Sequence, residues 1–86
     1  MQNIFSKWQI LSLSINNRIV RSATWEGAAT AQGDVTDKLV QYYHDLAKGG
    51  VGLIISGYMY IQPDGIGLAY QTGIYSDEQI LSLIHI

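Results

Sequence analysis

The sequence predicts an α/β fold built from a β-hairpin and a following βαβ unit. β-branched residues lie in the middle of the segment Arg18–Thr24, which predicts a strand. Apolar residues at helical spacing follow the capping residue Thr36, which predicts a helix. The run Val51–Ser56 is nearly continuous in apolar residues and comes directly after Gly49 and Gly50. Such a run is typical of a strand buried on both faces of a parallel sheet, and strand, helix and strand in succession form a βαβ unit. Because a lone βαβ unit leaves strand edges unpaired, we expect the sheet to continue into a larger body.

The first part of the chain is expected to form the hairpin. From Ile10 to Ile15 apolar and polar residues nearly alternate, which predicts a short half-buried strand. Asn16 and Asn17 predict a turn after this strand, because Asn tolerates left-handed backbone geometry. Arg18–Thr24 is then the next strand, and the small and polar residues 27–35 are expected to form a loop.

The helix is the best-defined element of the sequence. Thr36 can cap its N-terminus, Asp37 suits the positive end of its dipole, and Gly49-Gly50 can end it. Apolar residues recur between these limits at positions that share one helix face: Leu39, Tyr43, Leu46 and Ala47.

Two further signals lie after the buried strand. Pro63-Asp64-Gly65 predicts a turn. Ser76, with Gln79 three residues later, has the spacing of a capping box and predicts the start of a second helix.

Composition limits the possible partners and the compartment. The 86 residues are 48% hydrophobic and 14% charged, with a formal charge of −2 and no cysteine. This composition excludes a disordered chain, a disulfide framework and a thiolate metal site, and it gives no basic footprint for nucleic acid or an anionic membrane. The amino terminus lacks the apolar core of a signal peptide, and the run Val51–Ile55 is too short to span a bilayer, so a cytoplasmic protein is expected.

The candidate site lies where the two parallel strands end. In a β/α barrel, catalytic and cofactor-binding groups gather at the carboxyl ends of the strands. Here those ends are Ser22-Ala23-Thr24-Trp25 and Ser56-Gly57-Tyr58. Small residues there let a flat ring lie close to the backbone, where hydroxyl and amide groups can bond its rim. The same small residues would also simply fit a crowded barrel rim, and spacing alone leaves both interpretations open.

An ordered set of motifs resembles the old yellow enzyme family, the FMN-dependent NADH:flavin oxidoreductases. The motifs are Asn16–Gly27, Gly33–Thr36, Tyr42-Tyr43, Gly49–Ile55, Pro63–Gly65 and Gly73–Glu78. Each motif is weak singly, but together they cover nearly the whole chain in order. The resemblance implies the amino-terminal portion of a TIM (β/α)8 barrel, with the first βαβ unit and a preceding β-hairpin.

The resemblance also implies a cofactor and its contacts. The Ser22-Ala23-Thr24 backbone and the Thr24 hydroxyl would contact the flavin ring of FMN, and Gly57-Tyr58 would supply the second-strand contact. Tyr58 is bulky where the family often has alanine, and Trp25 stands where many members carry a Cys or Thr that tunes the flavin.

The reaction implied is a hydride relay from NADH or NADPH through FMN to an electron-poor alkene or similar small molecule. The family's substrate-binding His pair, its proton-donating Tyr and its FMN-phosphate groups lie on later strands. No catalytic residue is therefore expected within these 86 residues, and the chain alone should be inactive. The substrate, the choice of nicotinamide and the oligomeric state stay open.

Other polar residues suggest weaker sites. His44 is expected on a solvated helix face, and His85 has no metal-ligand partner at suitable spacing. Glu26 and Asp34 could form an acid/base pair, although solvated loop positions are the simpler interpretation; Glu26, beside Thr24, could instead face the active site.

The last six residues, 81–86, depart from the family pattern. They resemble the translation of an adapter used in transposase-based sequencing libraries, so we expect residues 1–80 to be the barrel portion and residues 81–86 to be non-biological. Two other functions stay open. One is a different FMN or phosphate-binding barrel enzyme, and the other is a short interaction module that uses its unpaired strand edges.

Overall fold

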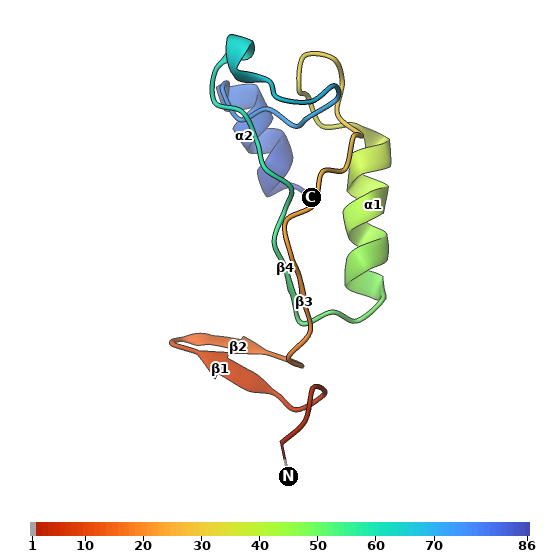
Figure 1. The fold of residues 1–86 in the computed structure, drawn as a ribbon, viewed down its shortest axis with the longest axis vertical. Coiled ribbons are helices and arrows are strands. Elements are labelled where there is room, and N and C mark those ends of the chain that lie inside the picture. Colours follow the sequence, from red (N-terminus) through yellow and green to blue (C-terminus); the bar gives the residue numbers. More distant parts are fainter. Residues whose placement is uncertain (1) are drawn as a thin grey trace.

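A computed structural model describes residues 2–86 and contains the expected βαβ unit (Figure 1). In chain order, the elements are β1 (Trp8–Ile10), β2 (Leu13–Ile15), β3 (Val20–Arg21), α1 (Asp37–Lys48), β4 (Leu53–Ile54), the 3-10 turn η1 (Pro63–Gly65) and α2 (Asp77–Ile84). The β1–β2 hairpin lies at one end of the molecule, α1 runs alongside β3 and β4, and α2 lies near the other end.

Strands β3 and β4 form a short parallel ladder. Val20 pairs with Leu53 and Arg21 with Ile54. The Ile19 carbonyl accepts from the N–H of Leu53 at 3.3 Å, and the Arg21 carbonyl accepts from the N–H of Ile55 at 3.0 Å. The ladder confirms the prediction that two parallel strands flank the helix, and it brings their carboxyl ends to one edge.

The hairpin exists, but its predicted boundaries are wrong. β1 and β2 pair antiparallel, with Trp8 opposite Ile15 and Ile10 opposite Leu13, so the turn falls at Leu11-Ser12 and not at Asn16-Asn17. Leu11 takes a φ of +53°, a conformation costly for a residue with a Cβ. Residues 10–15, whose alternating apolar and polar side chains predict one strand, instead contain the end of β1, the turn and all of β2. The later segment contributes only Val20–Arg21 to a strand, and that strand pairs with β4.

Helix α1 begins and ends where the sequence predicts. The Thr36 hydroxyl accepts from the N–H of Leu39 at 3.1 Å and donates to the carbonyl of Ala28 at 2.5 Å, so one side chain caps the helix and holds the preceding loop. Gly50, just after the helix, has a φ of +96°, which favours glycine. Leu39 is 1% exposed and anchors the apolar face of α1.

The second helix also has its predicted cap, with one difference. The Ser76 hydroxyl accepts from the N–H of Gln79 at 3.3 Å. The buried Gln79 side chain, however, accepts from the N–H of Tyr75 at 2.9 Å and donates to the Gln32 carbonyl at 3.1 Å. Gln79 thus joins α2 to the loop that follows β3. Its side chain does not bond the N–H of Ser76, which a reciprocal capping box would require.

The chain buries less surface than an autonomous domain of its size. Its accessible surface is 6131 Å², against about 5,000 Å² for a compact monomer of 9.5 kDa. Its radius of gyration is 14.8 Å, against about 12 Å for a compact domain of this length. The buried hydrophobic side chains are few: Ile15, Ala28, Ala29, Leu39 and Tyr60. Within residues 2–86 no helix is long and apolar enough to cross a membrane.

Candidate flavin-contact site

The two predicted strand ends meet at one edge of the β3–β4 pair. Gly57 is buried, and a Cβ built on it would lie only 2.5 Å from the carbonyl oxygen of Thr24. The backbone after β3 therefore passes directly against the backbone after β4. Glycine is required at this position because of the close approach.

The segment Ser22–Thr24 exposes its backbone at this edge. All three residues are exposed and lie outside regular structure, and among the described residues none of their N–H groups donates to a protein acceptor. The Thr24 hydroxyl donates to the Ser22 carbonyl at 3.0 Å, which leaves its oxygen lone pairs available to a donor. Small side chains beside uncommitted N–H groups suit the edge of a flat, polar-rimmed ring, so these residues fit an isoalloxazine ring.

Each strand end is followed by an exposed aromatic residue, Trp25 after β3 and Tyr58 after β4. Trp25 is 45% exposed, and its ring lies over Gly27, whose φ is +63° and whose built Cβ would approach the ring to 2.9 Å. Tyr58 is 50% exposed, and its ring lies 3.8 Å from the Cβ position of Gly67. The Tyr58 ring therefore contacts the 66–71 loop, although its backbone follows Gly57 at the strand end.

Arg21, which the sequence analysis did not select as a site residue, links the two strand ends. Its guanidinium donates through Nη1 to the Ile55 carbonyl at 2.8 Å and through Nη2 to the Thr24 carbonyl at 3.2 Å. Nη2 also contacts the Tyr42 hydroxyl at 3.0 Å. No local sequence pattern predicts this role for Arg21, because only the parallel pairing of β3 with β4 brings the Ile55 carbonyl near the Thr24 carbonyl.

Glu26 is not the solvated loop carboxylate that the simpler interpretation expected. It is half-buried and accepts a hydrogen bond from the Tyr43 hydroxyl, which itself accepts from the N–H of Gly57 at 3.1 Å. Burial, with the hydrogen bond to Glu26, raises the pKa of Tyr43, so the phenol stays neutral and donates. Helix α1 therefore ties the segment after β3 to the segment after β4.

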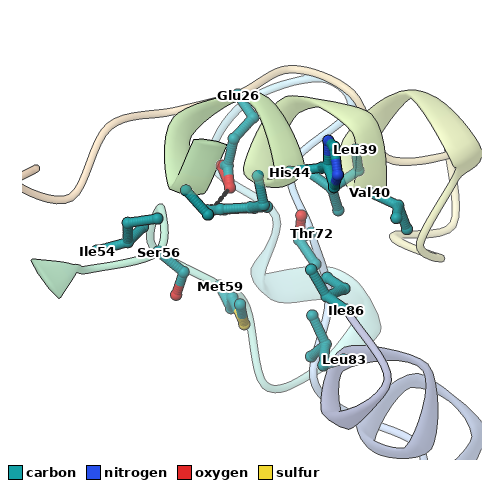
Figure 2. Close-up of a pocket in the computed structure, with 12 residues that line it drawn as sticks. Glu26, Leu39, Val40, His44, Ile54, Ser56, Met59, Thr72, Leu83 and Ile86 are labelled. Atoms are coloured by element: carbon teal, nitrogen blue, oxygen red, sulfur yellow. Dashed lines mark hydrogen bonds between the residues drawn. The ribbon is translucent and has the colours of Figure 1, made fainter. Parts of the chain in front are cut away.

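Glu26 also reaches an apolar pocket of about 520 Å³. Figure 2 shows its carboxylate directed beneath α1, with Ile54, Ser56 and Met59 along one side and Leu83 and Ile86 on another. The pocket is bordered by α1, by segment 54–59 and by the end of α2. It therefore belongs mainly to the contact between helix and strands, whereas the predicted flavin contacts lie at the strand ends.

The remaining polar candidates do not form a site. The His44 side chain is 64% exposed, with Nδ1 3.9 Å from Asp45, which confirms the prediction of a surface histidine. Asp34 is exposed and accepts from Gln79 at 3.2 Å. Glu26 and Asp34 are thus held by different partners, α1 for the first and α2 for the second.

A parallel β3–α1–β4 unit with its strand ends at one edge is the building unit of a β/α barrel. The sequence model of the NADH:flavin oxidoreductase / NADH oxidase family matches residues 3–86. The chain therefore belongs to this family.

Known relatives agree with this assignment. The chain is 38% identical over 81 residues to a metal reductase of Desulforamulus reducens, and 38% identical over 77 residues to an NADH oxidase of Thermoanaerobacter brockii. These alignments cover 94% and 88% of this chain but only 12% of either relative. The structure of an old yellow enzyme homologue from Zymomonas mobilis superposes with a TM-score of 0.83 at 30% identity, covering 94% of this chain and 22% of that one. The fold is that of the amino-terminal portion of a TIM barrel.

Proposed function

We propose that this chain supplies the first flavin contacts of an FMN-dependent oxidoreductase that uses NADH or NADPH. The observation that carries the proposal is the exposed Ser22–Thr24 backbone lying against Gly57, in a chain that belongs to a flavin oxidoreductase family. Bound FMN would supply hydride transfer from a nicotinamide nucleotide to an electron-poor small molecule such as an activated alkene.

The residues of this chain would bind and orient the ring. The N–H groups of Ser22, Ala23 and Thr24 can donate to carbonyl oxygens on the ring rim, and the Thr24 oxygen can accept from a ring N–H. Trp25 can exclude water from one side of the contact. Gly57 and Tyr58 would contribute through their backbone, since the Tyr58 ring contacts the 66–71 loop.

The test begins with the reading frame in source DNA, amplified outward from the codons for Thr36 and Ser56. We expect a frame long enough for a barrel of about 250 residues, with a His-containing motif on a later strand. The purified product should be yellow and should oxidise NADH or NADPH when an electron-poor alkene is added. A frame that ends after Ile86, or a full-length product that binds no FMN, would refute the proposal and leave the interaction module.

The same DNA tests the proposal that residues 1–80 form the barrel portion and residues 81–86 are adapter-derived. Residues 81–84 continue α2, and the family match includes residues 81–86, so this stays a prediction. Independent genomic reads should depart from the present sequence after Ile80. The same six codons followed by a stop codon in independently assembled genomes would contradict it. Action in the cytoplasm remains part of the proposal as well.

A further inference from the structure

We propose that Arg21 is a positioning residue that holds the two flavin-contacting strand ends at a fixed spacing. This inference rests on the proposed function. It adds Arg21 of β3, which acts through the two backbone carbonyls that it bonds and is not itself a proposed flavin contact. The guanidinium donates to Thr24 after β3 and to Ile55 after β4, at 3.2 and 2.8 Å. Because the guanidinium is planar and rigid, one group bonded to both carbonyls fixes the distance between them.

Two tyrosines of α1 hold the guanidinium in place. Its Cζ lies 5.4 Å from the ring centroid of Tyr42 and 5.7 Å from that of Tyr43. The two rings meet edge to face, with centroids 5.6 Å apart and planes at 85°. The charge of Arg21 is thus stabilised by two aromatic rings and two backbone carbonyls. These contacts restrict the orientation of the guanidinium, and therefore the directions in which its N–H groups can donate.

A second link joins the same two segments. Tyr43 accepts from the N–H of Gly57 and donates to Glu26, two residues after Thr24. Arg21 therefore constrains the carbonyls of Thr24 and Ile55, and Tyr43 constrains the N–H of Gly57, which follows β4. Together these groups orient successive peptide planes in the segments that would contact the flavin. Without them, binding would have to order these exposed segments at an entropic cost.

The variants separate the effect of the positive charge at position 21 from that of the planar guanidinium geometry. Arg21→Lys keeps the charge, but its ammonium is a point charge and lacks the planar fork that reaches both carbonyls. Tyr42→Phe keeps the ring beside the guanidinium and removes only the hydroxyl that Nη2 contacts. Arg18→Lys is the matched control, because Arg18 lies 5.5 Å over the Trp8 ring of the hairpin, away from the strand ends.

The experiment uses the protein expressed from its full reading frame. Apoprotein of each variant is titrated with FMN, and the visible circular dichroism and reduction potential of the bound flavin are measured. For Arg21→Lys we expect an FMN Kd about tenfold higher, because binding would then have to order the released segments, and we expect an altered flavin dichroism. Arg18→Lys should match wild type in both. If the Arg21 variant does not fold, Tyr42→Phe, which removes the hydroxyl that Nη2 contacts at 3.0 Å, should raise the FMN Kd in the same direction.

The outcomes distinguish this inference from the proposed function. A folded Arg21→Lys protein, or in its absence a folded Tyr42→Phe protein, with wild-type FMN affinity, dichroism and potential would overturn the positioning role while leaving the flavoprotein assignment intact. Equal losses in Arg21→Lys and Arg18→Lys would also overturn it, since the effect would then be general. A wild-type protein that binds no FMN would overturn both.

Discussion

Replacing Gly57 by alanine tests the close approach of the two strand ends. The new Cβ would lie 2.5 Å from the Thr24 carbonyl oxygen, and it would also meet the Glu26 carboxylate. A carbon and a carbonyl oxygen normally stay about 3.3 Å apart, so one backbone must move by roughly 0.8 Å. The carboxylate can swing away, but the carbonyl belongs to the backbone. We expect a loss of about 1–3 kcal/mol in the free energy of unfolding, typical of overpacking.

Gly49→Ala provides the matched control, because it adds the same methyl group at an unstrained position. Gly49 has a φ of −69°, and its new Cβ would meet carbonyl oxygens at 3.4 and 3.5 Å, which is ordinary contact. We expect this variant to gain up to about 1 kcal/mol by restricting the unfolded chain. Urea unfolding of the full-length protein, followed by far-UV circular dichroism, measures both variants.

A double variant separates the two contacts of Gly57. Adding Glu26→Ala removes the carboxylate from the path of the new methyl group and leaves the Thr24 carbonyl in place. We therefore expect Glu26→Ala to lower the cost of Gly57→Ala only in part. Stability of Gly57→Ala equal to that of Gly49→Ala would refute the close approach of the two strand ends.

Three further predictions concern α1 and its contacts. Leu39→Ala should cost about 2–5 kcal/mol in urea unfolding, because Leu39 is 1% exposed and alanine would leave a cavity; an unchanged midpoint would contradict its burial. Thr36→Ala should cost about 1–2 kcal/mol, since it removes both the helix cap and the bond to Ala28. The raised pKa of Tyr43 means that the folded state holds its proton more tightly than the unfolded state, so stability should fall as the pH rises above about 10. Tyr43→Phe should reduce that fall, as measured by thermal unfolding at pH 8 and pH 10.5.

Local signals determined the order of the elements. The cap at Thr36, the apolar face that includes Leu39 and the glycines at 49 and 50 predict α1 to within a residue, because capping and helical periodicity depend on neighbours along the chain. The apolar run from Val51 likewise predicts β4, although the regular ladder covers only Leu53–Ile54. The family resemblance rests on the same ordered motifs and is confirmed by the match to residues 3–86.

Tertiary pairing decided the rest. The hairpin turn falls at Leu11-Ser12, although Leu11 must adopt a positive φ there, because the pairing of Trp8 with Ile15 sets the register. The contacts of Arg21 and Glu26 follow only from the fold, in which β4 and α1 bring Ile55, Gly57 and Tyr43 beside the end of β3. Ile55 lies 34 residues from Arg21 in the chain, and Tyr43 lies 17 residues from Glu26. Hydrogen bonds over that separation leave no periodic or local trace in the sequence, so only the folded arrangement reveals which backbone groups these side chains hold.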